Sequence, residues 1–236
     1  MLCVKRFLGH YKTMSLEKGI GYTYYVPAPC KEEVKVVYAD DDIVLVDKPA
    51  GLLSVPGRIL KDSVFQRLLY EFPDLSVVHR LDLDTSGLMV FANSRTAVTK
   101  LNRQFRERSI AKTYEALVFG RVSEHSGRIE LPIGPDPNNR PLRRVDFEKG
   151  KQSLTLFELI KAEEGCSRLR LKPITGRSHQ LRIHLMAIGH PILGCDLYAH
   201  PSALSASERL CLHAKSLVLE HPSSKKKVEF FSEVPF

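Results

Sequence analysis

Residues 79–87 read His-Arg-Leu-Asp-Leu-Asp-Thr-Ser-Gly and stand between two apolar runs, at 77–78 and 88–91. The apolar runs favour β-strands, and Thr-Ser-Gly favours a turn between them. A loop held between two strands keeps a side chain at a fixed point on a rigid scaffold, as a catalytic group usually requires. The stretch therefore predicts either a carboxylate presented for chemistry, Asp82, or an ordinary charged surface turn.

A second polar cluster, at residues 172–184, favours the chemical interpretation. Within it, basic or imidazole side chains gather at the expected start of a helix: Arg177, His179, Arg182 and His184. His179 and Arg182 share a helix face, and a helix N-terminus favours an anion such as a phosphate or a carboxylate. Arg182 would form a buried or half-buried ion pair with Asp82 and keep it ionised, as a nucleophile or base needs. The alternative is a helix start with ordinary solvated charges.

Two other assignments of these side chains carry less weight. Asp84 could be the second member of an acid/base pair, but its place directly before Thr85 favours a turn-capping role. His179 and His184 do not share a helix face, and no third ligand stands at a metal-binding spacing. The sequence therefore predicts no metal site here.

The composition is that of a folded, basic protein. The chain has 236 residues, of which 43% are hydrophobic and 26% charged, with a net charge of +8 and a pI of about 9.3. This charge favours an anionic partner, and nucleic acid is favoured over a membrane because no long amphipathic basic helix is apparent. No apolar run reaches the ~18 residues of a membrane span, and the N-terminus lacks the apolar core of a signal peptide. We therefore expect a cytoplasmic protein that does not bind membranes.

The cysteines and glycines give no sign of a disulfide framework or of a cofactor. The five cysteines are scattered and form no CxxC pair: they are Cys3, Cys30, Cys166, Cys195 and Cys211. This pattern argues against disulfides and structural zinc, and it fits a reducing cytoplasm. The glycine spacings of dinucleotide-binding and phosphate-binding loops are also absent.

The apolar pattern predicts many short strands and a few helices. Strands are expected at 34–38, 43–47, 52–55, 114–119, 153–160, 167–171, 217–220 and 228–231, besides the two that flank residues 79–87. Helices are expected at 62–72, 94–109 and 178–188, with Ser or Asp caps at the first two starts and Pro or Gly stops. Residues 1–33 lack a clear period and are expected to form a flexible or loosely docked arm before a domain at 34–236. The mixture is typical of an α+β fold.

The helix expected at 94–109 has a strongly basic surface. Ala97, Leu101 and Phe105 recur at helical spacing and form its apolar stripe. The other faces carry five basic residues and a single acidic one, namely Arg95, Lys100, Arg103, Arg106, Arg108 and Glu107. This pattern is expected of a solvated helix face, and the alternative is a face that follows the phosphates of a nucleic acid.

Residues 79–87 resemble the HRLDxxTSG signature of the RluA-type pseudouridine synthases. Residues 171–184 resemble the third motif of the same family, and Lys112-Thr113-Tyr114 is similar to the intervening K-x-Y motif. Segments 51–64, 189–198 and 212–214 also resemble short members of the family. Three motifs in the right order make the resemblance specific, and it extends over residues 34–236.

The resemblance implies an isomerase that converts uridine to pseudouridine inside RNA. It implies an α+β fold with a mixed, largely antiparallel sheet, flanking helices and an active-site cleft across the sheet. Asp82 matches the catalytic aspartate, Tyr114 the tyrosine that packs on the target base, and Arg182 the arginine that pairs with the aspartate. Arg80 matches a residue that enters the RNA where the base leaves the stack. Further RNA contacts are expected from His79, Arg106, Arg140, Arg177 and His179.

The implied reaction requires no cofactor and no metal. The N1–C1′ bond breaks, the uracil turns, and C5 bonds to C1′ without any redox change. The carboxylate could attack C1′, attack C6 or remove the 2′ proton, and each route needs an ionised Asp82 beside the ribose. The base must leave its stack, at a cost of a few kcal/mol that phosphate contacts and stacking on Tyr114 (~1–3 kcal/mol) would offset. The alternative for Tyr114 is a strand tyrosine half in the core.

The resemblance also implies a substrate class. Some relatives carry an N-terminal S4-type RNA-binding domain, for which the 33 residues before the catalytic region leave no room. Short members without that domain act on a stem-loop found in the tRNA anticodon loop and in 23S ribosomal RNA. We expect the same targets here, for an enzyme that acts as a monomer.

Two other classes of protein remain open on the residues alone. A non-catalytic RNA-binding or RNA-folding protein would carry the same positive charge, but it would have no use for an arginine-paired aspartate. A glycoside hydrolase would need two carboxylates that flank the sugar, where only Asp82 and Asp84 are available and tryptophan is absent.

Overall fold

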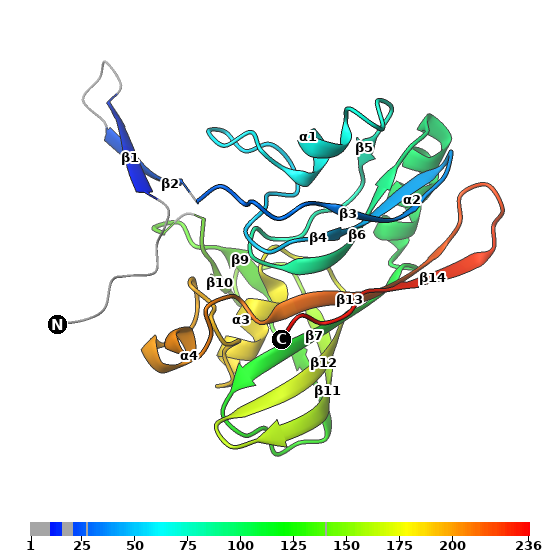
Figure 1. Cartoon of the computed structure of the whole chain (residues 1–236). Coiled ribbons are helices and arrows are strands. Elements are labelled where there is room, and N and C mark those ends of the chain that lie inside the picture. Colours follow the sequence, from blue (N-terminus) through cyan, green and yellow to red (C-terminus); the bar gives the residue numbers. More distant parts are fainter. Residues whose placement is uncertain (1–9, 16–20, 27, 140) are drawn as a thin grey trace.

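The molecule is built on a ten-stranded mixed sheet (Figure 1). The structure is a computed structural model and describes residues 10–15, 21–26, 28–139 and 141–236. The strands of the main sheet are β3 (Lys35–Ala39), β4 (Ile43–Lys48), β5 (Ser76–Val77), β6 (Ser86–Ala92), β7 (Ala111–Phe119), β8 (Ser126–Glu130), β11 (Leu154–Glu163), β12 (Cys166–Pro173), β13 (Leu212–Glu220) and β14 (Lys227–Phe231). The helices are α1 (Val64–Leu68), α2 (Arg95–Glu107), α3 (Gln180–Ala187) and α4 (Pro201–Ser205).

Strand β13 joins the two halves of the sheet. The strand order is β3-β4-β6-β13-β7-β12-β11-β8, with β14 beside β13 and β5 beside β6. β13 runs parallel to β6 and antiparallel to β7. In Figure 1, α1 and α2 accompany the half with β3, β4 and β6, and α3 and α4 accompany the half with β7, β12 and β11. The prediction of an α+β fold with a mixed, largely antiparallel sheet is confirmed.

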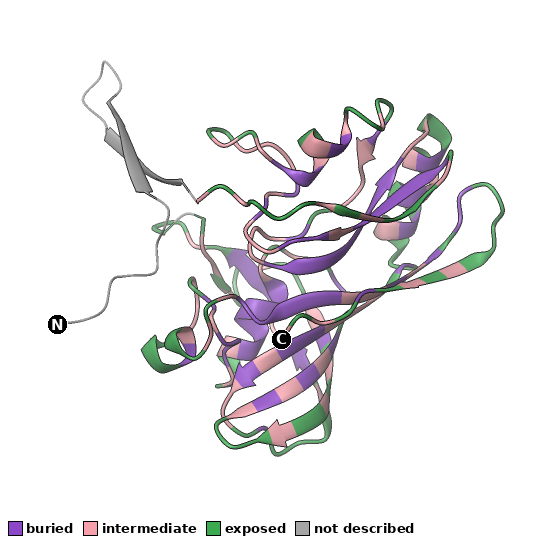
Figure 2. Cartoon of the chain, in the orientation of Figure 1, coloured by how far each residue is buried: buried purple, intermediate pink, exposed green. Residues whose placement is uncertain are grey.

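Buried side chains fix the strands and helices that surround the junction of the two halves. Val90 of β6 and Leu101 of α2 belong to one buried apolar cluster, and Leu169 of β12 and Leu185 of α3 belong to another. Figure 2 shows buried residues along β4, β6 and α3. The junction therefore lies on well-packed elements rather than on surface loops.

Gly87 allows β6 and β13 to approach each other. It stands opposite Ala214 in the parallel pairing and has a φ of 108°. A Cβ atom at this position would lie 2.4 Å from the carbonyl oxygen of Ala214. Only glycine fits both this backbone conformation and this contact, which explains the glycine at the end of residues 79–87.

The predicted helices are present, with local differences at their ends. Ser94 caps α2 by accepting a hydrogen bond from the backbone N–H of Ala97 (3.1 Å), as predicted. Ser63 caps α1, which ends at Leu68, earlier than predicted. α3 begins at Gln180, because His179 before it has the left-handed conformation with a φ of 58°.

The N-terminal arm contains regular structure that the sequence did not predict. β1 (His10–Ser15) pairs antiparallel with β2 (Gly21–Val26), a pairing that the apolar pattern of these residues did not indicate. A second small sheet pairs β9 (Ile133–Pro135) with β10 (Arg143–Val145). Residues 1–9, 16–20 and 27 of the expected arm lie outside the described residues, as does Arg140.

Within the described part of the chain, none of the helices has the length and apolar character that a membrane crossing demands.

Candidate active site

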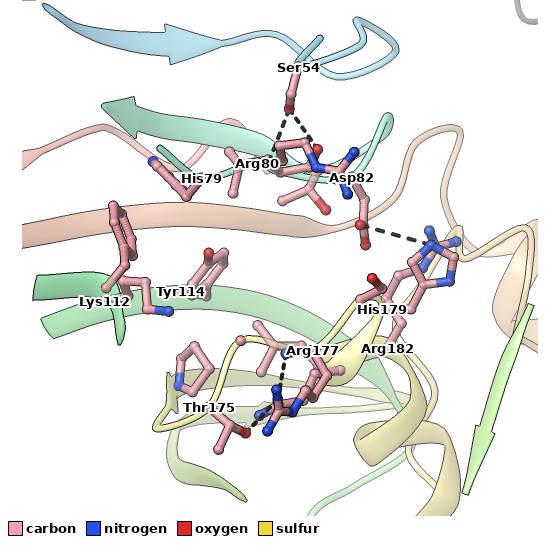
Figure 3. Close-up of a pocket in the computed structure, with 18 of the residues that line it drawn as sticks. Ser54, His79, Arg80, Asp82, Lys112, Tyr114, Thr175, Arg177, His179 and Arg182 are labelled. Carbon is pink, nitrogen blue, oxygen red and sulfur yellow. Dashed lines mark hydrogen bonds and ion pairs between the residues drawn. The ribbon is translucent and has the colours of Figure 1, made fainter. Parts of the chain in front are cut away.

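A cavity of about 930 Å³ opens at the junction of the two halves of the sheet (Figure 3). The loop before β6, strand β7, the end of α2 and the start of α3 all contribute to its lining. Asp82, Tyr114 and Arg182 line it together, although they lie far apart in the sequence. The structure therefore brings together the three residues that the sequence proposed as catalytic.

The backbone on both sides of Asp82 is held by residues 48–54. Ser54 Oγ donates to the carbonyl of Leu81 (2.7 Å) and accepts from its backbone N–H (3.0 Å). On the other side, the backbone N–H of Gly51 donates to the carbonyl of Leu83 (3.0 Å). Asp82 therefore projects from a loop whose neighbouring peptide groups are both bound, which limits its motion.

Lys48 reinforces this arrangement from inside the protein. Its side chain is fully buried, and Nζ donates to the carbonyls of Pro49, Leu52 and Leu83 at 2.7–2.8 Å. Burial lowers its pKa to about 7, while Asp84 and Asp82 act in the opposite direction. Three carbonyl acceptors match the three N–H bonds of the ammonium form, so Lys48 joins segment 48–52 to the Asp82 loop.

The Asp82 carboxylate faces His179. The distance from Asp82 Oδ1 to His179 Nε2 is 3.9 Å, and the dashed line in Figure 3 marks this pair. Burial lowers the pKa of His179, against the opposing effect of Asp82, so the imidazole is neutral at physiological pH. Asp82 thus faces a hydrogen-bonding ring rather than a fixed cation.

Arg182 has a different partner from the one that the sequence predicted. Its guanidinium forms an ion pair with Asp196, Nε approaches Cys195 Sγ at 3.3 Å, and Asp82 is not within ion-pair distance. The cause is the segment after α3, which returns beside this nearly fully buried side chain. Burial lowers the pKa of Arg182, but Cys195, Asp196 and Asp82 together raise it above its ordinary value. Asp82 therefore acts on Arg182 through space, and the predicted direct pair is corrected to Arg182–Asp196.

Tyr114 and Lys112 lie side by side on β7 and line the cavity. Burial, and then the charge of Asp82, raise the pKa of Tyr114, so the phenol keeps its proton. Burial also lowers the pKa of Lys112. A neutral phenol in the same cavity as a carboxylate can pack on a nucleobase without adding a second negative charge.

Gln180 organises the loop that carries Arg177 and His179. Its Oε1 accepts from Thr175 Oγ1 (2.6 Å) and from the backbone N–H of Arg177 (3.1 Å). Its Nε2 donates to the carbonyl of Leu154 (3.0 Å). One buried amide therefore ties the start of α3 to β11 and closes this wall of the cavity.

Comparison with known proteins identifies the fold and the reaction. Residues 42–187 match the family model of RNA pseudouridylate synthases. The chain belongs to the RNA pseudouridylate synthase family. It is 48% identical over 204 residues to the dual-specificity RNA pseudouridine synthase RluA of Yersinia pestis, with 85% of this chain and 99% of that protein covered. It is 44% identical over 220 residues to the protein of the same name from Escherichia coli strain K12, with 92% and 100% covered.

A solved structure supports the same assignment. Human RNA pseudouridylate synthase domain containing 1 has a TM-score of 0.76 and 29% identity, with 89% of this chain and 87% of that chain covered. The family resemblance and the pseudouridine synthase fold expected from the sequence are therefore confirmed. The synthase is an isomerase that forms pseudouridine in RNA.

The residues predicted to contact RNA have different positions in the synthase. Arg80 and Arg106 are exposed at the cavity, and Arg177 and His179 are partly buried in its wall. His79 accepts a hydrogen bond from the backbone N–H of Val90 (3.0 Å), and burial lowers its pKa to about 3. His79 is therefore neutral and supports β6, so it offers RNA no positive charge.

Four residues that shape the site were not predicted from the sequence as site residues. They are Lys48, Ser54, Asp196 and Tyr198. They act through backbone or side-chain partners far away in the sequence, so spacing carries no signal for them. Their only sequence signal was that all four lie within or just before segments that resemble the family.

Asp84 lies in the turn that precedes β6, which agrees with the turn position expected for it. Burial, followed by the charge of Asp196, raises its pKa. Among the described residues, no group of three or more His, Cys, Asp or Glu side chains is placed to hold a metal ion.

Proposed function

We propose that this synthase modifies uridines in the anticodon stem-loop of tRNA and in stem-loops of 23S ribosomal RNA. Asp82 is the catalytic carboxylate of this proposal. Two relatives that cover most of the chain are described as dual-specificity enzymes, which supports the choice of two RNA classes. The proposal extends to a monomeric enzyme in the cytoplasm.

One observation carries the catalytic assignment. Asp82 is the only carboxylate among the described residues that line the cavity. Six basic residues line the same cavity: Arg80, Arg106, Arg108, Lys112, Arg177 and Arg182. A single negative group surrounded by positive charge suits a polyanionic substrate whose reacting carbon must meet a carboxylate.

The cavity can receive a nucleotide that has left its stack. Its volume lies near the upper end of the ~300–1,000 Å³ typical of ligand sites, so it admits a base and ribose with part of the flanking backbone. Tyr114 would pack on the base, and Arg80 at the rim would occupy the place that the base leaves. Arg182, held by Asp196, would add positive potential near Asp82.

The chemistry assigned to these residues balances without an external reactant. The N1–C1′ bond of uridine breaks, the uracil turns within the cavity, and a C5–C1′ bond forms. The proton on C5 is released to solvent, and N1 takes up a proton from solvent, so the atoms balance. Each possible first step of Asp82 uses the carboxylate form of its side chain.

The test is the release of tritium from RNA labelled at C5 of uridine. We expect release by the wild-type protein with whole tRNA and with 23S ribosomal RNA, and none by Asp82→Asn. Asp74→Asn is the matched control, because Asp74 is exposed and does not line the cavity. Release by Asp82→Asn at the wild-type rate would remove Asp82 from the mechanism. RNA binding without release by the wild-type protein would instead favour a non-catalytic RNA-binding protein.

A further inference from the structure

Tyr198 contacts two side chains that line the cavity with Asp82, namely His179 and Arg182, although it does not itself line the cavity. It lies on the segment that follows α3. Its hydroxyl oxygen is 2.6 Å from His179 Nδ1, and the guanidinium carbon of Arg182 lies 5.5 Å from the centre of its ring. A single tyrosine therefore touches His179 through its polar end and Arg182 through its aromatic face.

The hydrogen bonds of the Tyr198 hydroxyl determine where its proton lies. The oxygen accepts a hydrogen bond from the backbone N–H of Arg143 (3.0 Å). The phenolic proton then needs an acceptor, and His179 Nδ1 is the one within reach among the described residues. With Tyr198 as the donor to Nδ1, the proton of a neutral imidazole lies on Nε2.

His179 Nε2 faces Asp82 Oδ1 at 3.9 Å. This distance is longer than a hydrogen bond, as is common for catalytic contacts before the substrate binds. The surroundings agree with a neutral ring: burial lowers the pKa of His179 most, and Arg182 and Arg143 lower it further, against the opposite effects of Asp82 and Asp196.

We propose that Tyr198 is a positioning residue of this synthase: its hydroxyl fixes His179 in the tautomer that presents Nε2–H to Asp82, while its ring packs on Arg182. The proposal rests on the catalytic role proposed for Asp82. A purely structural tyrosine would pack equally well with either tautomer, so the position of the imidazole proton separates the two roles.

The first arm of the test needs no RNA. Imidazole ¹⁵N resonances of the free protein, assigned by comparison with His179→Gln, report which nitrogen carries the proton. We expect His179 to be protonated on Nε2 in the wild-type protein and to lose this single tautomer in Tyr198→Phe. A proton on Nδ1 in the wild-type protein would overturn the proposal. This arm gives its answer even if the protein releases no tritium from either RNA.

The second arm measures turnover. Tyr198→Phe keeps the ring on Arg182 and removes only the hydroxyl, so we expect kcat to fall about 3- to 10-fold with KM close to that of the wild type. Tyr70→Phe is the matched control, because the side chain of Tyr70 is fully exposed. An unchanged kcat in Tyr198→Phe, or a rise in KM alone, would contradict the proposal.

A double-mutant cycle tests whether the hydroxyl acts through His179. In the His179→Gln background, the imidazole is gone, and Tyr198→Phe should cause no further loss of kcat. Equal, additive losses in the two backgrounds would mean that the hydroxyl acts by another route, and the assignment would fall.

Discussion

At the scale of single residues, the ion-pair partner of Arg182 determines whether a guanidinium binds the Asp82 carboxylate directly. In the free protein, the guanidinium is bound to Asp196 and packed on Tyr198, and its side chain is only 2% exposed. In the part of the chain that the structure describes, no Lys or Arg side chain lies within ion-pair distance of Asp82. A carboxylate that must attack or take a proton benefits from this arrangement, because a bound guanidinium would occupy the same lone pairs.

The Arg182–Asp196 pair leads to a stability prediction. Asp196→Asn leaves a buried guanidinium without its charged partner, so the free energy of unfolding should fall by about 1–3 kcal/mol. Urea unfolding measures this loss, and the slope of the free energy of unfolding against urea concentration should not change. Glu158→Gln is the control, because the Arg170–Glu158 pair is exposed and should lose less than about 1 kcal/mol.

The same pair carries a prediction about activity. Arg182→Met fills a similar volume and removes the positive charge beside Asp82, so tritium release should fall by at least about 100-fold while the fold is kept. Circular dichroism checks the fold. A near wild-type rate in a folded Arg182→Met protein would show that Arg182 is not needed for catalysis.

At the scale of secondary-structure elements, the sequence predicted those whose signals are local. α2 has its cap at Ser94 and an apolar stripe that includes Leu101, and both are visible within a few residues. The Asp82 loop was also predictable, because apolar runs flank it. In contrast, Asp196 reaches Arg182 only because Gly189 and Pro191 turn the chain back after α3, and no spacing in the sequence indicates that contact.

The end of α2 provides a test of its basic face. Arg106 lines the cavity, whereas Arg95 is exposed at the other end of the same helix. If α2 follows RNA phosphates, Arg106→Gln should weaken RNA binding and reduce the slope of log affinity against log salt by about one unit. Arg95→Gln should change neither. Equal effects of both substitutions would favour an ordinary solvated helix face.

The junction of β6 and β13 gives a second prediction at this scale. Gly87→Ala would place a Cβ 2.4 Å from the carbonyl oxygen of Ala214, so it should cost at least about 3 kcal/mol or prevent folding. Gly165→Ala is the matched control, since Gly165 also has a positive φ but nothing lies within 4 Å of its added Cβ. It should cost about 1 kcal/mol in thermal or urea unfolding. Similar losses at both sites would mean that backbone strain, and not the close contact, explains Gly87.

At the scale of the whole molecule, a buried network of side-chain hydrogen bonds joins strands from distant parts of the sequence. His213 of β13 contacts Ser86 Oγ through Nδ1 and Ser232 Oγ through Nε2, both at 2.9 Å. Ser232 in turn donates to Asp47 of β4, and Arg209 donates to Ser86. Because Ser86 begins β6 just after the Asp82 loop, this hydrogen-bond network ties β6 to β4 and to the hairpin of β13 and β14. Such networks stabilise one arrangement when every member is bonded.

His213 makes this network sensitive to acid. Burial lowers its pKa to about 4, from an ordinary value near 6.5. As the pH falls, the unfolded chain therefore takes up the proton first. The stabilisation is fully present above pH 6.5 and is lost as the pH falls toward 4, on the order of 3 kcal/mol in total.

Comparison with His213→Gln separates the contribution of His213 to the pH dependence of stability from that of the other buried histidines. The variant should be less stable than the wild type at pH 7.5, because it loses the bonds to Ser86 and Ser232. The difference between the two proteins should then shrink as the pH falls from 6.5 to 4, since glutamine does not titrate. Urea unfolding at a series of pH values measures it, with His125→Gln as the control, because His125 is exposed. Stability curves of wild type and His213→Gln that stay parallel over this range would show that His213 is protonated equally in the folded and unfolded states.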